Sequence, residues 1–216
     1  MMDKFEKARN IEKRMKELED VRSDYEDLHK EVIKFIAPQR YNYDRTEQRG
    51  KKYGSSVYDG SPISALNLFA DGIFGSMMNP AMRWFRTKLH REFWKVNKVT
   101  PRDRMDIQEW LDEVEWRLYS AFSRSNIYEE VPEFLRDGGS IGTATMYGEE
   151  DIARDRVVFS TRHPGECFIA ENNFGFVDCM YRKFKWNLRK IVQRWGTDNL
   201  PPEIRDLAEP SMDREF

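Results

Sequence analysis

The longest periodic pattern in the sequence is its opening stretch, residues 4–36, where apolar residues recur at helical spacing among many charged ones. The apolar positions form two series with a period of seven residues: Ile11, Leu18, Tyr25 and Val32, and Val21, Leu28 and Phe35. This heptad repeat predicts one long amphipathic helix with an apolar seam. We favour a seam packed inside its own subunit, because such heptads are common in helical bundles. The alternative is that part of the seam faces a neighbouring subunit.

A second helix is predicted from residue 61 to residue 78. Ser61 and Pro62 are favourable residues for a helix start, and an apolar stripe at helical spacing follows them. Gly72 and Gly75 lie inside this stripe, where a glycine costs about 1 kcal/mol relative to alanine. We therefore predict that another backbone approaches closely at both glycines, as in a tight helix crossing.

Asn79 and Pro80 end the second helix, and Trp84 and Phe85 follow in a short extended run. Two adjacent aromatic side chains bury a large apolar area when they pack in a core. We predict that Trp84 and Phe85 are structural anchors, with Pro80 fixing the turn before them. A ligand-binding aromatic pair is the alternative, but no convergent polar groups accompany these residues in the sequence.

Two further helices are predicted between residues 100 and 137. Thr100 and Pro101 begin the first, and a shorter helix follows at residues 127–137. The glycine-rich segment 138–142 then predicts a tight turn from helix to strand. It does not fit a phosphate loop, which follows a strand, precedes a helix and carries a lysine with serine or threonine.

From residue 143 onwards the sequence becomes β-forming. Four short strand candidates follow one another, at residues 143–148, 157–161, 166–170 and 176–184. Residues 172–175 have the composition of a hairpin turn. These features predict a small antiparallel β-meander, followed by a helix at residues 188–196.

The pattern as a whole predicts an α+β fold that is mainly helical. It combines a long N-terminal helix and a helical layer, residues 1–142, with a C-terminal part, residues 143–216, that holds the small sheet and terminal helices. The last residues bring no closing element. We therefore expect the chain to be the front part of a longer protein, which continues into a further C-terminal region.

Composition narrows the class of protein. The 216 residues are 39% hydrophobic and 34% charged, and no run approaches the length of a membrane-spanning helix, about 18 apolar residues. The 36 basic and 38 acidic residues nearly balance, so the net charge predicts no polyanionic partner. The two cysteines are too few for a disulfide framework, and the first residues lack the apolar core of a signal peptide. These features fit a reducing cytoplasm.

Two basic segments with interleaved aromatic residues make a nucleic-acid-binding module the alternative function. In the first, residues 40–53, the basic side chains are Arg40, Arg45, Arg49, Lys51 and Lys52. The second, residues 181–195, includes Lys183 and Lys185. Such segments bind single strands by charge and base stacking. We favour a solvated connection for the first segment, and for the second a strand with its aromatic residues inside and its lysines outside.

No catalytic or metal-binding signature accompanies these elements. His163, Cys167 and Cys179 are potential zinc ligands, but a structural zinc site needs four ligands, usually in close pairs. No serine lies in a nucleophile elbow, and neither cysteine has a histidine nearby in a recognisable motif. We predict that the protein is not an enzyme and has no cofactor.

Several segments occur in a characteristic order along nearly the whole chain: residues 35–40 at the end of the first helix, the helix at 61–78 with Asn79, Pro80, Trp84 and Phe85, residues 125–128 before 133–135, the glycines of 138–142, and residues 175–184 before the helix at 188–196. This ordered set resembles the N-terminal wing region of the head-to-tail connector, or portal, proteins of short-tailed bacteriophages.

The resemblance implies a structural protein of the virion without catalysis, assembled in the host cytoplasm. It implies a homo-oligomeric ring at one capsid vertex, a dodecamer in the full-length form. A separate terminase pumps double-stranded DNA through its channel during packaging, and the DNA leaves through the same channel during ejection. Tail adaptor proteins attach to the ring. The major capsid and scaffolding proteins are further partners. Portal subunits are much longer than this chain, and their stem, clip and channel-lining helices follow the wing region, so the resemblance implies a fragment or a reduced relative.

Overall fold

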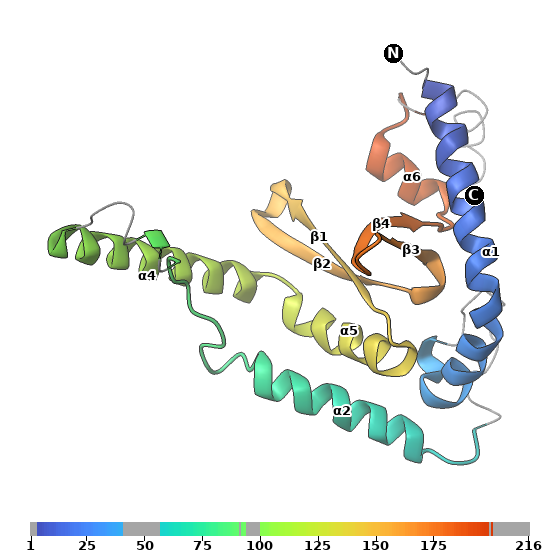
Figure 1. The fold of residues 1–216 in the computed structure, drawn as a ribbon, viewed down its shortest axis with the longest axis horizontal. Helices are drawn as coiled ribbons and strands as arrows, with labels where there is room; N and C mark the ends of the chain where they lie inside the picture. Colours follow the sequence, from blue (N-terminus) through green and yellow to red (C-terminus); the bar gives the residue numbers. More distant parts are fainter. Residues whose placement is uncertain (1–3, 41–56, 91, 94–99, 199, 201–216) are drawn as a thin grey trace. The chain divides into compact units, whose positions relative to one another are not determined.

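The computed structural model describes residues 4–40, 57–90, 92, 93, 100–198 and 200 (Figure 1). Its helices are α1 (Lys4–Ile36), α2 (Ser61–Met77), α4 (Pro101–Arg124), α5 (Ile127–Ile141) and α6 (Leu188–Trp195). Its strands are β1 (Thr145–Asp151), β2 (Arg156–Arg162), β3 (Cys167–Glu171) and β4 (Val177–Arg182). The mainly helical α+β class, with a long N-terminal helix and small antiparallel sheets in the C-terminal half, is confirmed.

The chain forms two compact units. The smaller unit combines the start of α1, as far as Leu18, with β3, β4 and α6. The larger unit runs from Glu19 to Gly165 and contains the rest of α1 with α2, α4, α5, β1 and β2. The change from helix-forming to β-forming sequence at residue 143 lies inside the larger unit. The division into residues 1–142 and 143–216 therefore stays a prediction from the sequence pattern.

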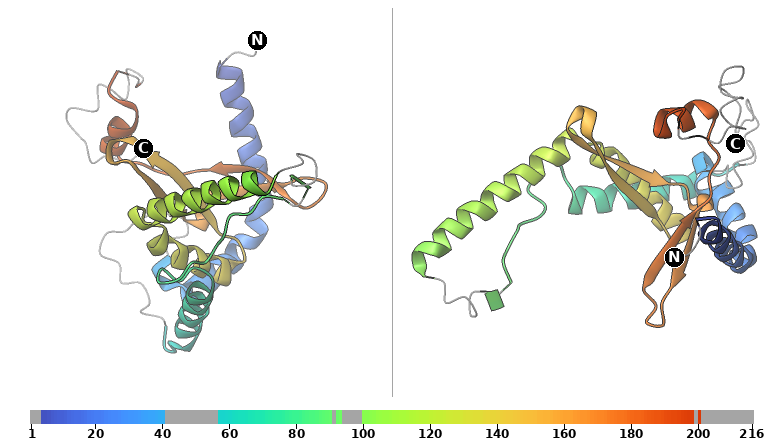
Figure 2. Two further views of the ribbon diagram at one scale, coloured as in Figure 1. Left: turned by 90° about the vertical axis from the view of Figure 1, so that its left-hand side faces the viewer. Right: turned by 90° about the horizontal axis from the view of Figure 1, so that it is seen from above.

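In the larger unit, α5 lies between α2 and the β1–β2 hairpin, as the views in Figures 1 and 2 show. Leu66 and Ala70 of α2 are buried, as are Ile127 and Val131 of α5. These residues recur at helical spacing, so each helix turns one apolar stripe inward. The helix α5 is thus the central element of this unit and contacts elements on both of its sides.

The close approach between α2 and α5 takes place at Gly139. A Cβ atom at this position would lie 2.7 Å from the ring of Phe69 and 3.1 Å from Leu66. At Gly72 and Gly75, by contrast, no neighbouring part of the described chain lies within 4 Å of such an atom. The prediction of a close backbone approach at Gly72 and Gly75 is therefore wrong for the described residues. Both glycines lie on the exposed side of α2, and helical spacing alone did not reveal which side meets α5.

Much of the heptad seam of α1 is exposed in the described part of the chain. Its exposed members, more than half accessible to solvent, are Ile11, Val21, Tyr25 and Leu28. The side of α1 that packs in the larger unit carries Ile33, which is fully buried, and Arg22, whose side chain is 17% exposed. The Arg22 guanidinium donates hydrogen bonds to the carbonyl oxygens of Pro164 and Gly165, at 3.3 and 3.1 Å. Within the described residues a partly polar side of the helix makes the contact, and the packing of these exposed residues inside their own subunit stays a prediction.

The helix ends follow local chemistry. Thr100 caps α4 as predicted, and its hydroxyl and the Asp103 carboxylate form a reciprocal capping box. The helix α5 runs to Ile141, beyond its predicted end at residue 137, and Gly142 ends it in a left-handed conformation with φ of +83°. Most of the glycine-rich segment is therefore the last turn of α5, and only Gly142 makes the turn.

The four strands form two separate antiparallel hairpins and not one meander. In the first, β1 pairs with β2 from Thr145 opposite Arg162 to Asp151 opposite Arg156. In the second, β3 pairs with β4 from Cys167 opposite Arg182, with an irregularity after Ala170. A 3-10 turn at Pro164–Glu166 separates the hairpins. Backbone groups of β2 bind side chains of α5 instead of a third strand.

Candidate functional site

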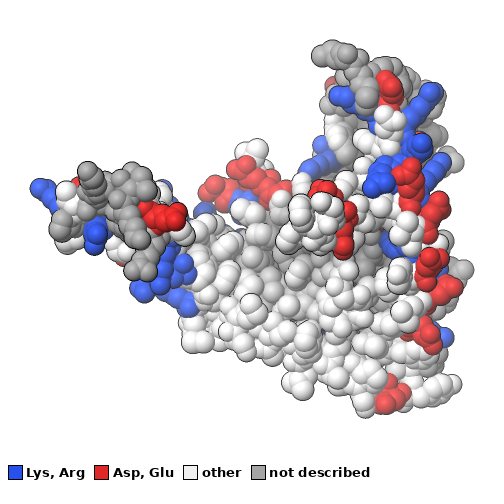
Figure 3. Space-filling view, in the orientation of Figure 1, with Lys and Arg blue, Asp and Glu red and all other residues white. Residues whose placement is uncertain are grey.

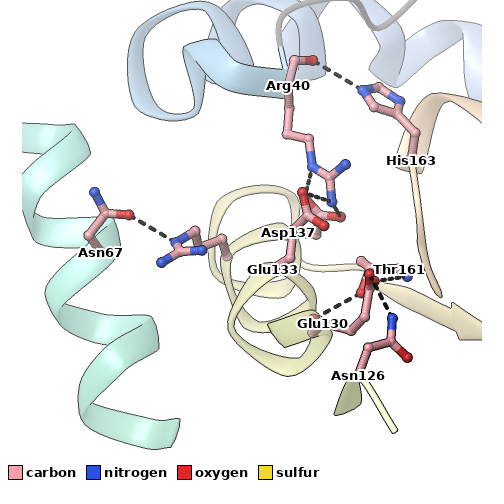
Figure 4. Close-up of polar contacts among 9 residues, drawn as sticks. Arg40, Asn67, Asn126, Glu130, Glu133, Asp137, Thr161 and His163 are labelled. Atoms are coloured by element: carbon pink, nitrogen blue, oxygen red, sulfur yellow. Dashed lines mark hydrogen bonds and ion pairs between the residues drawn. The ribbon is translucent and has the colours of Figure 1, made fainter. Parts of the chain in front are cut away.

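A connected group of polar side chains in the larger unit lies around α5. It comprises Arg40, Asn67, Asn126, Glu130, Glu133, Arg136, Asp137, Thr161 and His163, which we call the α5 network (Figure 4). These residues come from the end of α1, from α2, from α5 and from the region of β2, so the network joins segments far apart in the sequence.

The centre of the α5 network is a buried ion pair. The Arg40 guanidinium donates from Nε and Nη2 to the two carboxylate oxygens of Asp137, at 3.0 and 2.9 Å. Glu133 accepts a further contact from Nη2 at 3.1 Å. The Asp137 side chain is 1% exposed and that of Arg40 is 17% exposed. Two parallel charge-assisted bonds in a buried setting hold both side chains in one orientation.

His163 fixes the backbone of Arg40. Its Nε2 lies 3.1 Å from the carbonyl oxygen of Arg40, and its Nδ1 accepts the backbone N–H of Gly165 at 3.1 Å. Because Nδ1 is an acceptor, the ring proton of the neutral imidazole belongs on Nε2, which donates to Arg40. Both the side chain and the backbone of Arg40 are therefore held, at the end of the 3-10 turn that follows α1.

The electrostatics of Asp137 reflect its burial. Desolvation raises the pKa of Asp137 from 3.8 to about 6, and it outweighs the opposing attraction and hydrogen bond of the Arg40 guanidinium. The neighbouring Glu133 carboxylate adds to the increase in this pKa. The free-energy cost of removing the Asp137 carboxylate from water therefore exceeds the stabilisation that its cationic partner Arg40 provides.

Side chains of α5 also bind the backbone of β2. The Asn126 amide exchanges two hydrogen bonds of 2.8 Å with the backbone of Phe159. Two residues further along β2, Thr161 donates from its N–H to the Glu130 carboxylate and from its hydroxyl to the Glu130 carbonyl. In this way α5 satisfies backbone groups that a neighbouring strand would otherwise pair.

On the α2 side, Arg136 completes the network. Its Nε donates to Asn67 at 2.9 Å, and its Nη2 lies 3.5 Å from the Asp71 carboxylate. The pair with Asp71 is solvent-exposed and contributes little stability. The contact with Asn67 lies beside the apolar stripe of Leu66 and Ala70, so it helps to fix the register of α2 against α5.

The predicted anchors Trp84 and Phe85 pack against the aromatic face of α4. The Phe85 ring stacks on Tyr119 at 4.5 Å between centroids, and the Trp84 ring stacks on Phe122 at 5.7 Å. The Tyr119 hydroxyl accepts the Phe85 N–H and donates to the Phe85 carbonyl, both at 2.9 Å. These two hydrogen bonds between the Tyr119 hydroxyl and the backbone of Phe85 take the place of strand pairing. The energetic role of Trp84 and Phe85, and of Pro80 before them, stays a prediction.

The described residues offer little for catalysis. No group of three or more histidine, cysteine, aspartate or glutamate residues in this part of the chain is arranged to hold a metal ion. An open groove of about 450 Å³ between residues 86–89 and α4 is lined by side chains such as Arg86, Gln108 and Asp112. In the same described part of the chain, no helix is long and apolar enough to cross a membrane. The α5 network suits the maintenance of a fixed geometry more than a reaction.

The residues that we predicted as nucleic-acid contacts lie in different settings in the structure. Arg40 belongs to the α5 network, so its predicted contact with DNA or a partner does not fit the structure. Arg45, Arg49, Lys51 and Lys52 lie outside the described residues. Lys183 and Lys185 are exposed, while Phe184 and Trp186 between and beside them are half-buried, with ring centroids 4.8 Å apart. This alternation agrees with the favoured interpretation of aromatic residues inside and lysines outside.

Sequence reasoning missed the α5 network itself. Glu130, Glu133 and Asp137 recur at spacings of three and four residues, which places them along one side of a helix. That spacing was a usable signal for a polar contact surface. Their partners Arg40 and Thr161 lie far away in the sequence, and no local pattern connects them.

Comparisons with known proteins agree with the resemblance seen in the sequence. The family model described as "Bacteriophage head to tail connecting protein" matches residues 8–216. The chain is 26% identical over 215 residues to the portal protein of Salmonella phage epsilon15, covering 96% of this chain and 36% of that protein. It is also 26% identical over 183 residues to the probable portal protein of Bordetella phage BPP-1, covering 83% and 31%. The chain thus spans about a third of the length of these relatives.

Proposed function

We propose, because the chain belongs to the family of bacteriophage head to tail connecting proteins, that it is the wing region of a portal subunit. The family match over residues 8–216 carries this proposal, because it includes both compact units and every described helix and strand from α2 onward. The role is structural: the subunit connects the head and the tail of the virion and performs no catalysis.

The geometry supports this role through the α5 network. A subunit of a large assembly needs fixed relationships between its elements, so that the surfaces it presents to its neighbours keep one shape. The paired Arg40 and Asp137, together with the bonds from Asn126 and Glu130 to β2, connect α1, α5 and β2 without forming a catalytic arrangement. Buried polar groups that are satisfied in only one arrangement favour a single conformation.

The complete protein is proposed to form a homo-oligomeric ring at one capsid vertex, with twelve subunits in its full-length form. In that setting its partners are the major capsid and scaffolding proteins, the terminase, the tail adaptor proteins and the double-stranded DNA in the channel. Assembly takes place in the host cytoplasm, and the mature location is the virion.

Electron microscopy and native mass spectrometry of the full-length parent protein test this proposal. We expect closed rings with one defined subunit number. A protein that stays strictly monomeric under assembly conditions would contradict the portal role. A parallel DNA-binding titration at several salt concentrations separates the alternative, because a phosphate-binding module loses affinity steeply as salt rises. A monomer with such a salt dependence would favour the nucleic-acid-binding module.

A further inference from the structure

The part of α1 in the larger unit carries an apolar stripe that the described part of the chain leaves largely exposed. The stripe, which we call the α1 seam, consists of Val21, Tyr25, Leu28, Val32 and Phe35. Val21, Tyr25 and Leu28 are 67%, 59% and 58% exposed. The alternating spacing of four and three residues places the whole seam on one side of the helix. Single exposed apolar residues are common, but a continuous stripe of them marks an interaction surface.

One flank of the α1 seam already contacts the chain itself. On this flank Ile33 is fully buried, and Arg22 bonds to the Pro164 and Gly165 carbonyls and to Glu26 at 2.9 Å. The helix is therefore fixed to the larger unit through this flank. The α1 seam lies beside it and is available to a further element.

The other flank of the α1 seam is acidic. It carries five exposed carboxylates at spacings of three and four residues, which we call the acidic row: Glu17, Asp20, Asp24, Asp27 and Glu31. Along the right-hand edge of Figure 3, red acidic side chains lie among white uncharged and blue basic ones. A partner that packs on the seam meets this row at its own edge.

We propose that the α1 seam binds an amphipathic helix of a partner protein, and that the flank of this helix facing the acidic row is basic. Apolar residues at a heptad spacing accept the knobs of a second helix, which inserts side chains between them. Opposite charges along the flank select the partner and its orientation. This inference goes beyond the portal role and does not depend on the ring.

A second copy of α1 fits this surface poorly. In an antiparallel pair the two acidic rows would lie opposite each other, and like charges at such positions are unfavourable. In a parallel pair each acidic row would face the flank of Arg22 and Ile33, which its own chain occupies. The charges therefore favour a different helix with basic flanks.

Two designed peptides test the proposal. Both are fluorescent heptad peptides of about three heptads with isoleucine and leucine at the a and d positions, and they carry either lysine or glutamate at both flanks. Fluorescence anisotropy with the 216-residue chain measures their affinities at low and high salt. We expect the lysine peptide to bind at least about tenfold more tightly than the glutamate peptide, with a difference that shrinks as salt rises.

Variants of the chain locate the binding. Leu28→Asp should weaken binding of the lysine peptide by at least about tenfold. Met105→Asp, which changes an exposed apolar residue on α4, should leave this binding unchanged. The double variant Asp24→Lys with Glu31→Lys nearly balances the charge of the row, so it should remove most of the preference for the lysine peptide. Circular dichroism of each variant confirms that it is folded.

Three outcomes would overturn the proposal. The first is that neither peptide binds, and the second is that both bind equally and Leu28→Asp has no effect. The third is self-association of the chain in sedimentation equilibrium that Leu28→Asp abolishes, since the occupant would then be a second copy. A failure of the full-length protein to form rings would count against the portal role and leave these peptide measurements unaffected.

Discussion

The guanidinium of Arg40 and the carboxylate of Asp137 are joined by two parallel hydrogen bonds of 3.0 and 2.9 Å, although 97 positions separate them in the sequence. This pair attaches the end of α1 to the last turns of α5. It joins a buried carboxylate to a partly buried guanidinium, so both the desolvation cost of the charges and their mutual attraction are large.

Replacing Arg40 with alanine should lower the free energy of unfolding by about 3–5 kcal/mol, because it leaves the Asp137 carboxylate buried without its cationic partner. Urea unfolding followed by circular dichroism measures the change. The matched control is Arg117→Ala, which breaks an exposed pair with Glu113 and should cost less than about 1 kcal/mol. The double variant Arg40→Met with Asp137→Leu should be milder than Arg40→Ala. Equal effects of Arg40→Ala and Arg117→Ala would show that the buried pair contributes no more to the free energy of unfolding than the exposed pair does.

Stability should depend on pH through Asp137. Its pKa of about 6 in the folded protein lies above the usual 3.8, so the folded state holds this proton more tightly than the unfolded chain. The stabilisation from the protonated carboxyl is therefore complete below about pH 4 and is lost as the pH rises through about 6. Its full size is at most about 3 kcal/mol.

Urea unfolding between pH 4 and pH 7 checks this dependence in the wild type and in Asp137→Asn. Asparagine does not titrate. If Asp137 causes the pH dependence, the free energy of unfolding of the wild type relative to that of Asp137→Asn should therefore decrease from pH 4 to pH 7. Asp24→Asn removes an exposed carboxylate from α1 and should keep the wild-type profile. A parallel pH dependence of the wild type and Asp137→Asn would assign it to other groups.

A glycine substitution tests the packing of α2 on α5. Gly139→Ala should destabilise the protein by about 1–3 kcal/mol, because the new Cβ atom would lie 2.7 Å from the Phe69 ring. Gly72→Ala is the control, since its Cβ atom meets no neighbouring part of the described chain, and it should be neutral or stabilise the helix by up to about 1 kcal/mol. Thermal unfolding of both variants provides the comparison. If Gly72→Ala were the more damaging change, a close contact at Gly72 would have to exist after all.

Much of this architecture could be predicted from local sequence patterns. The heptad in residues 4–36 predicted α1 with its observed bounds, and Thr100 with Pro101 predicted the start of α4. Such features depend on neighbouring residues, whose periodicity and capping preferences act over a few positions. The class of the fold followed from these local patterns.

Long-range arrangement could not be predicted in the same way. The exposed α1 seam and the open surroundings of Gly72 show that a helical stripe does not reveal which of its sides the chain covers. The division of the four strands into two hairpins depends on bonds from Asn126 and Glu130 to β2, which join residues more than thirty positions apart. Arg40 and its partners Asp137 and His163 are also far apart in the sequence, so no local pattern predicted these contacts.

The aromatic cluster at Trp84 provides the last test. The Trp84 ring lies 4.8 Å from Phe85, 5.7 Å from Phe122 and 6.2 Å from Tyr119, measured between centroids, and its Nε1 donates to the Tyr128 hydroxyl at 3.3 Å. Trp84→Ala should therefore lower the free energy of unfolding by about 3 kcal/mol. This is the lower end of the range for a tryptophan in a core, because the side chain is only half-buried.

Trp110→Ala is the matched control, because Trp110 on α4 is 60% exposed and its loss should cost less than about 1 kcal/mol. Thermal and urea unfolding of both variants, with the yield of folded protein, measure the difference. A Trp84→Ala variant as stable as Trp110→Ala would mean that residues 80–89 form a contact surface for another molecule. A larger loss for Trp84→Ala would establish that this extended segment holds α4 through its aromatic rings, since no strand of the described chain pairs with it.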